Sequence, residues 1–277
     1  MSSIGEIHVG LSGWDYAGWR GDFYPRDLPA RRRLEYVAQR FDTVEINGSF
    51  YSLQRPTSYE RWRDATPDGF VFAVKGGRFI THMKRLKGVE QGLANFFASG
   101  PLALGDKLGP VLWQLPMSLR FDEDLLRSFL ALLPRTTAAA AELGRQHDRR
   151  LRDRVWLEPT EDRPIQHVVE ARHRSFDEPR FYDLLERQGV ACVASDSPTW
   201  PLLDRRTADH SYIRLHGHTR LYASGYSGRS LDHWAERSRE LAADGPVHVY
   251  FDNDARGRAP YDALRLRERL GLVGSDT

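Results

Sequence analysis

The stretch VEINGSFY at residues 44–51 places a carboxylate and an amide inside a run that otherwise has the composition of a β-strand. Val44 and Ile46 are good strand formers, and they alternate with Glu45 and Asn47. Side chains on a strand point alternately to its two faces. On a half-exposed strand the two polar side chains would face water. On a strand buried on both faces they would point into the interior, so the rest of the chain decides between the two.

Short apolar runs of the same character recur along the whole chain. There are eight of them, at residues 7–14, 43–50, 70–77, 110–116, 167–175, 190–197, 212–217 and 247–253. Segments with helical period separate several of these runs, at residues 29–41, 122–134, 178–189 and 231–245. Strands that alternate with helices predict a parallel sheet, and eight such units in about 250 residues are typical of a closed barrel. We therefore expect an α/β fold, a (β/α)8 TIM-type barrel that forms one domain over residues 1–277.

Two connections depart from regular alternation. The sixth and seventh runs are close together, so residues 197–210 can form at most a very short helix. The connection before the fifth run is long, and the alanine-rich segment within residues 136–154 predicts an extra helix there.

The composition excludes several classes of protein. Lys and Arg (40 residues) nearly balance Asp and Glu (38), and the net charge of +2 argues against a strongly basic nucleic-acid coat, although a local basic patch remains compatible with it. Cys192 is the single cysteine, which excludes an internal disulfide and a cysteine zinc cluster. No signal-peptide pattern and no apolar run near the roughly 18 residues of a membrane span is present, so we expect a cytoplasmic protein without membrane contact. The oligomeric state is left open.

In a parallel barrel every strand is buried on both faces, and the alternation then assigns each side chain to a face. Val44 and Ile46 face the helices, and Glu45 and Asn47 point into the barrel. For Asp196, at the end of the sixth run, the face is less certain. Counting the other runs in the same way predicts further inward side chains, namely Ser12, Trp14, Lys75, Gln114, Glu170, Arg172, Arg214, His216, Tyr250 and Asp252.

Most of these polar residues lie near the C-terminal ends of their strands, which is where barrel enzymes build their sites. A lone buried charge would cost several kcal/mol, so we expect Glu45 to be buried and paired with a base. An ionic network that only stabilises the barrel is the structural alternative. Costly polar groups gathered at one mouth nevertheless favour a functional site.

Eight stretches of the chain resemble a known family, domain-of-unknown-function family 72, the YecE-like family. The resemblance implies a TIM-barrel-like fold. It implies no activity, because the biochemical role of the family is not established. The stretches include GLSGWDYAGWRGDFYP (10–25), FDTVEINGSFYSLQRP (41–56), KLGPVLWQLP (107–116), EARHRSF (170–176), YIRLHG (212–217) and YFDND (250–254), and they follow one another over almost the whole chain.

The inward residues predict an enzyme, a hydrolase or a lyase, acting on a small anionic substrate that is phosphorylated or nucleotide-like. Inward lysine and arginine side chains attract phosphate or carboxylate, and histidine and carboxylates exchange protons. We predict catalytic roles for Glu45, Lys75, Glu170 and His216. We predict substrate-binding roles for Trp14, Asn47, Gln114, Arg172, Arg214 and Asp252.

Several alternatives stay open. Lys75 could form a Schiff base with a carbonyl substrate, or it could be a salt-bridge lysine. Glu45, Glu170, Asp196 and His216 could together bind Mg²⁺ or Mn²⁺. Aromatic residues in the loops, beside basic ones, keep a nucleic-acid ligand and a nuclease or repair role open. A barrel that acts as a non-catalytic scaffold is the last alternative.

Overall fold

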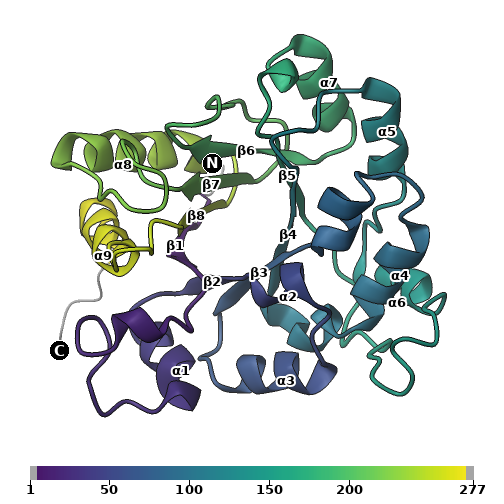
Figure 1. The fold of residues 1–277 in the computed structure, drawn as a ribbon, viewed down its shortest axis with the longest axis horizontal. Helices are drawn as coiled ribbons and strands as arrows, with labels where there is room; N and C mark the ends of the chain where they lie inside the picture. Colours follow the sequence, from purple (N-terminus) through teal and green to yellow (C-terminus); the bar gives the residue numbers. More distant parts are fainter. Residues whose placement is uncertain (1–4, 273–277) are drawn as a thin grey trace.

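The computed structural model describes residues 5–272, and its eight parallel strands close into a barrel in chain order, with helices around it (Figure 1). The TIM-type α/β barrel predicted from the sequence is therefore confirmed. The strands are β1 (Ile7–Ser12), β2 (Thr43–Ile46), β3 (Val71–Lys75), β4 (Leu108–Gln114), β5 (His167–Glu170), β6 (Ala191–Asp196), β7 (Ser211–Leu215) and β8 (Val247–Phe251).

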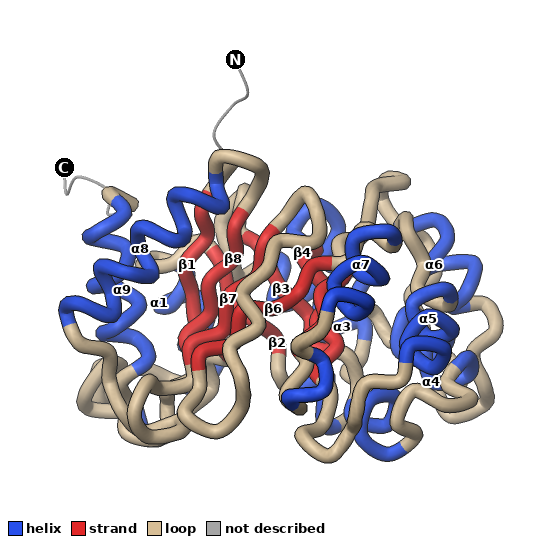
Figure 2. Tube along the Cα trace, turned by 90° about the horizontal axis from the view of Figure 1, so that it is seen from above, coloured by secondary structure: helices blue, strands red, loops and turns tan. Residues whose placement is uncertain are grey.

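The helices include those that the helical periods predicted, together with others that they did not. Figure 2 shows them on both sides of the strands. The extra helix before β5 is α6, and residues 197–210 contain no helix, as expected. The predicted helices are α1 (Arg33–Ala38), α5 (Glu123–Ala131), α6 (Thr137–Gly144), α7 (Pro179–Arg187) and α8 (Gly228–Ala242), and those not predicted are α2 (Gly48–Tyr51), α3 (Pro56–Asp64), α4 (Glu90–Ala98) and α9 (Ala259–Leu270).

Local chemistry explains where several helices begin. The side chains of Asp122, Thr136 and Ser227 each accept a hydrogen bond from a backbone N–H in the first turn of α5, α6 and α8. Such caps satisfy donors that the helix itself leaves free. Within residues 5–272, no helix combines the length and the apolar character that a bilayer crossing requires.

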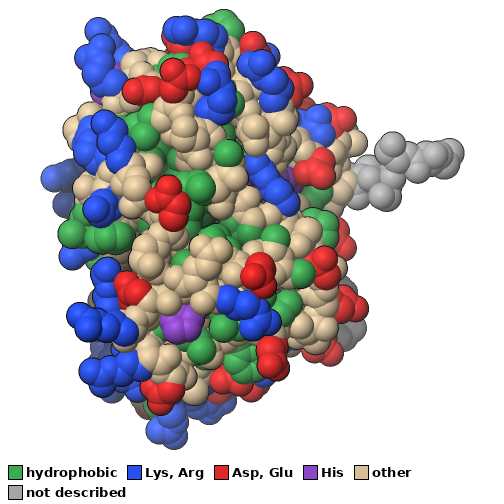
Figure 3. Space-filling model, turned by 90° about the vertical axis from the view of Figure 1, so that its right-hand side faces the viewer, with side chains coloured by type: hydrophobic (Ala, Val, Ile, Leu, Met, Phe, Trp, Pro, Cys, Tyr) green, Lys and Arg blue, Asp and Glu red, His purple; other side chains and the backbone are tan. Residues whose placement is uncertain are grey.

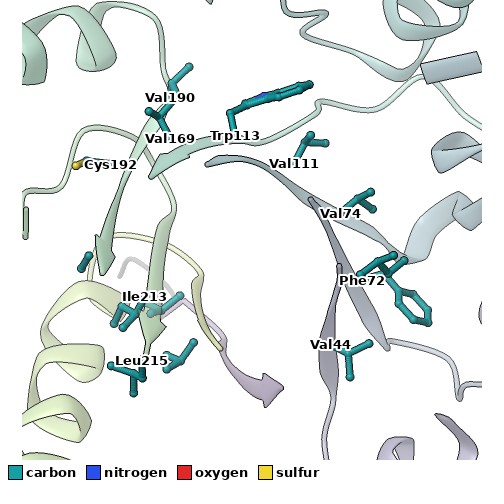
Figure 4. Packing of buried hydrophobic residues seen from close by; sticks show 14 of the residues in the cluster. Val44, Phe72, Val74, Val111, Trp113, Val169, Val190, Cys192, Ile213 and Leu215 are labelled. Atoms are coloured by element: carbon teal, nitrogen blue, oxygen red, sulfur yellow. The ribbon is translucent and has the colours of Figure 1, made fainter. Parts of the chain in front are cut away.

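The apolar residues divide into two groups, as expected for strands buried on both faces. The outer group faces the helices and includes Val44, Phe72, Val111, Trp113 and Ile213 (Figure 4). The inner group fills the barrel itself and consists of Ala73, Leu112, Val168, Ala191, Val193, Tyr212 and Tyr250.

The polar residues form a layer above this inner group, toward the C-terminal ends of the strands. The strand register aligns Ser12 with Glu45 and Gln114 with Glu170. On the other side of the barrel, β6 and β7 align Ser195 with Arg214. The barrel therefore has an apolar floor and a polar mouth.

Candidate functional site

Arg214 lies at the centre of the polar layer, and its side chain is fully excluded from solvent. Its Nε and Nη2 donate to the two carboxylate oxygens of Glu45, at 3.0 and 2.7 Å. Nη1 donates to Glu170 at 2.9 Å and lies 2.9 Å from His216 Nε2, and Nη2 also donates to Asp252 at 3.0 Å. A guanidinium has five N–H donors, and these contacts occupy all of them. Arg214 therefore organises the mouth and has no donor left for a substrate.

Glu45 is buried and points inward, as the sequence predicted. Besides Arg214, its carboxylate accepts hydrogen bonds from Ser12 Oγ at 2.5 Å and from the Tyr212 hydroxyl at 2.6 Å. Asn47, at the end of the same strand, donates from Nδ2 to Ser12 Oγ at 2.8 Å. The acid in VEINGSFY is thus a fully paired interior group.

Glu170 is the second hub of the layer. Its carboxylate accepts from Arg172 Nε at 2.8 Å, Gln114 Nε2 at 2.9 Å and Ser195 Oγ at 3.0 Å, in addition to Arg214. Burial alone would raise the pKa of Glu170, but the charges of Arg172 and Arg214 hold that pKa well below its usual value. Glu45 and Glu170 both have their oxygens occupied by protein donors, so neither carboxylate is free to accept a hydrogen bond from a ligand.

His216 is fully buried beside two cations. Its Nε2 faces Arg214 Nη1 at 2.9 Å and Arg172 Nη2 at 3.1 Å, so this nitrogen accepts hydrogen bonds and Nδ1 carries the ring hydrogen, 3.4 Å from Ser195 Oγ. Burial and the charge of Arg214 lower the pKa of His216. Asp252 Oδ2, 3.2 Å from Nε2, acts in the opposite direction, and the lowered pKa favours the neutral imidazole.

Lys75, the last residue of β3, differs from the two arginines. Its ammonium lies over the Phe50 ring, 4.4 Å from the centroid. Among residues 5–272, it donates no side-chain hydrogen bond and has no carboxylate within ion-pair distance. Within these residues Lys75 is therefore not a salt-bridge lysine, which was one of the two alternatives for it. Burial, followed by the charge of Arg214, lowers the pKa of Lys75 to about 8.

A second effect of this unpaired charge is visible at His82. Its ring lies across from Phe50, with centroids 5.0 Å apart. Burial, and after it the charges of Lys75 and Arg172, together lower the pKa of His82 to about 4. The sector of the mouth around β3 and β5 is therefore electropositive.

Arg172 is the other cation with capacity to bind a ligand. Its guanidinium stacks on Trp200 at 3.9 Å, and its side chain remains 10% exposed. Nη1 has only a long contact, 3.4 Å, with the Tyr222 hydroxyl. Tyr222 has a φ of +59°, a left-handed conformation that non-glycine residues adopt rarely.

The sequence analysis missed Ser195 and Trp200. On β6, Ser195 points into the mouth, and Asp196 points away, with Oδ2 3.4 Å from His218 Nδ1. Counting by two from the inner residue Val193 would have found Ser195. Trp200 donates from Nε1 to Ser195 Oγ at 2.9 Å, but it lies in an irregular segment whose pattern gives no signal.

Trp14 does not reach the polar layer, although the alternation predicted an inward side chain. It packs against Trp62 with ring centroids 5.3 Å apart and against Phe72 at 6.5 Å. The reason is Gly13, whose φ of +96° ends the regular alternation directly after Ser12.

The residues considered for a divalent cation do not converge. Glu45 and Glu170 are paired with Arg214, and Asp196 points away from both. Within residues 5–272, no group of three His, Cys, Asp or Glu side chains is arranged to hold a metal ion. Within the described residues, the polar layer therefore offers no ligand set for Mg²⁺ or Mn²⁺.

Comparisons with known proteins agree with this architecture. The family model described as "Protein of unknown function DUF72" matches residues 8–276. The UPF0759 protein YunF of Bacillus subtilis is 24% identical, over 96% of this chain and 95% of the YunF chain. The UPF0759 protein YecE of Escherichia coli is 31% identical, over 40% of this chain and 38% of the YecE chain. The crystal structure of a DUF72 family protein from Thermotoga maritima is similar with a TM-score of 0.78 and 26% identity, over 96% of this chain and 99% of that one.

Proposed function

The chain belongs to DUF72, a family of proteins of unknown function, and from that premise we propose that it is a lyase-type enzyme that binds a small anionic carbonyl compound through the amine of Lys75. The observation that carries the proposal is the contrast between the cations of the mouth. Arg214 is fully occupied by protein groups, whereas Lys75 has no carboxylate partner among the described residues and lies at the open end of β3.

The reaction begins with the neutral amine. Lys75 Nζ adds to the carbonyl carbon, and the resulting carbinolamine loses water to give an imine. Once protonated, the imine withdraws the electron pair of a bond that joins the neighbouring carbon to a carboxylate or to a carbinol carbon. That bond breaks, and the carboxylate leaves as CO2, or the carbinol carbon leaves as an aldehyde while its hydroxyl proton passes to water. The enamine that remains takes up a proton on its carbon, and water then releases the product and restores the amine. A lowered lysine pKa favours the first step because more of the amine is neutral.

Arg172 supplies the anion-binding part of the site. Its partly exposed guanidinium can bind a carboxylate or a phosphate by donating hydrogen bonds from Nη1. Stacking on Trp200 fixes the plane of the guanidinium. Glu170 accepts a hydrogen bond from Arg172 and so positions it. Gln114 and Ser195 in turn donate to Glu170 and hold that carboxylate in place.

A hydrolase is the less favoured of the two reaction classes. Hydrolysis needs a base that activates water. The oxygens of Glu45 and Glu170 are occupied by donors, and His216 Nε2 faces two arginines.

Trapping with borohydride tests the proposal. The protein is incubated with pyruvate, glyceraldehyde 3-phosphate and related small anionic carbonyl compounds, reduced, and analysed by intact mass and peptide mapping. We expect a reduced adduct on Lys75 and none on Lys107, a buried lysine whose Nζ donates to the Arg63 and Thr66 carbonyls at 2.7 Å each. The variant Lys75→Met should give no adduct at residue 75 and should keep only the adducts that exposed amines such as those of Lys84 and Lys87 form in both proteins. Folded protein that forms no adduct at Lys75 with any of the compounds would contradict the proposal and favour the scaffold alternative.

A second function, nucleic-acid binding, is supported by a different observation. A groove of about 830 Å³ on the surface is lined by arginines at 55, 149, 150, 152 and 154 and by one acid, Asp153. Figure 3 shows Lys and Arg side chains along the left-hand border of the face it presents, and others at the top with Asp and Glu among them. If this groove follows a phosphate backbone, affinity for single-stranded DNA or RNA should fall steeply with salt, and Arg149→Gln with Arg152→Gln should reduce that slope. Binding that does not depend on salt would exclude this function.

A further inference from the structure

A second groove, of about 370 Å³, adjoins the mouth on the side of β1 and β2. The short helix α2 separates it from Lys75, because Phe50 lies under the lysine and the next residue, Tyr51, lines the groove. Trp14, which does not enter the polar layer, lines this groove instead.

The walls of the groove are aromatic. Trp14 and Trp62 meet edge to face at 83°, and Tyr51 is 68% exposed, an unusual position for a large aromatic side chain. Flat aromatic surfaces that remain accessible can stack on the face of a planar ligand.

One buried acceptor in the lining lacks a partner. Ser12 Oγ donates its single hydrogen to Glu45, so Asn47 must present its NH2 group to Ser12 Oγ. This fixes the orientation of the amide, and Asn47 Oδ1 is left without a hydrogen-bond partner among the described residues. An unsatisfied buried acceptor is costly, and because Asn47 lines the groove, a small shift of its side chain would let an N–H group of a ligand satisfy it.

The groove also has a free cation. Arg61 lines it, is exposed, and makes no side-chain hydrogen bond or ion pair within residues 5–272. The nearby acid Asp15 is already paired with Arg33 at 2.5 Å. A guanidinium without a partner binds phosphate in bidentate fashion.

We propose that this groove binds a nucleoside monophosphate, with the base stacked between the aromatic walls, an N–H of the base on Asn47 Oδ1 and the phosphate on Arg61. A sugar phosphate fits less well, because it has no planar ring to stack on the aromatic walls and no N–H group to donate to Asn47 Oδ1. The site is independent of Lys75 and of the imine chemistry proposed above, so either proposal can fail alone.

Binding of AMP, GMP, CMP and UMP, followed by tryptophan fluorescence and titration calorimetry, tests this site. We expect at least one of the four to bind with a submillimolar dissociation constant and to change the emission of Trp14 and Trp62. Tyr51→Ala should weaken that binding about tenfold, because base stacking is lost. Arg61→Gln should weaken the nucleotide about tenfold and leave the uncharged nucleoside unaffected.

Matched controls are available on the same chain. Tyr261→Ala removes another exposed tyrosine, and Arg120→Gln removes another exposed arginine, and neither lines the groove, so both should bind as the unaltered protein does. Ribose 5-phosphate that binds as tightly as the nucleotide would overturn the proposal, since the base would then contribute nothing. Absence of binding by all four nucleotides at millimolar concentration would overturn it as well.

Discussion

Arg214 holds Glu45 with two parallel hydrogen bonds, Nε to Oε2 at 3.0 Å and Nη2 to Oε1 at 2.7 Å, and both side chains are fully buried. The pair joins β7 to β2 across the barrel, between residues 169 positions apart in the sequence. Removing one partner leaves the other charged, buried and uncompensated.

We therefore predict that Glu45→Gln or Arg214→Met lowers the free energy of unfolding by about 3–5 kcal/mol. Urea denaturation followed by circular dichroism measures this loss. The exposed pair Arg32 and Glu35, 2.9 Å apart, is the control, and Glu35→Gln should cost less than about 1 kcal/mol. Equal losses at the two sites would mean that the buried pair is not a determinant of stability.

Lys75 gives a prediction for alkaline pH. Its pKa is about 8 in the folded protein and 10.5 when unperturbed, so between these values the unfolded chain binds more protons than the folded one. Stability contributed by this residue should therefore rise with pH across that window, by about 3 kcal/mol in total. The free energy of unfolding of the unaltered protein minus that of Lys75→Met, measured from pH 7 to 10, isolates the effect. A difference that stays constant with pH would show that Lys75 is not desolvated.

Asp252 and Glu170 give a prediction for acid pH. Burial raises the pKa of each carboxyl group, but nearby charges lower it by more. Arg214 lowers the pKa of Asp252 below its ordinary value of 3.8, and Arg172 with Arg214 lowers the pKa of Glu170 below 4.5. Their contribution to stability should be complete above about pH 5 and should be lost as the pH falls below it. In urea titrations from pH 7 to 3, the stability advantage over Asp252→Asn should shrink toward the acid end. An advantage as large at pH 3 as at pH 7 would contradict the lowered pKa of Asp252.

The alternation of side chains was sufficient to predict the barrel and much of its mouth. It directed Glu45, Lys75, Glu170 and Arg214 inward, because strands of a closed parallel barrel are regular and buried on both faces. It failed at Trp14, where the positive φ of Gly13 changes the direction of the chain, and it did not settle the face of Asp196.

Other features had no signal in a single sequence. Which carboxylate pairs with which arginine depends on side-chain length and on the stagger of the strands, so the sequence could not foresee that Lys75 stays unpaired while Arg214 is saturated. Trp200 reaches Arg172 from an irregular connection that has no period to count.

The location of Arg214 on the seventh strand has a consequence for how the chain folds. During synthesis, β2 and β5 emerge from the ribosome well before residue 214 does, so Glu45 and Glu170 have no Arg214 to receive them for much of that time. A nascent half-barrel would have to bury these acids without their main counter-ion, or leave them in water. Closure is thus expected to wait for the seventh strand, and isolated halves of the barrel should not persist as stable intermediates.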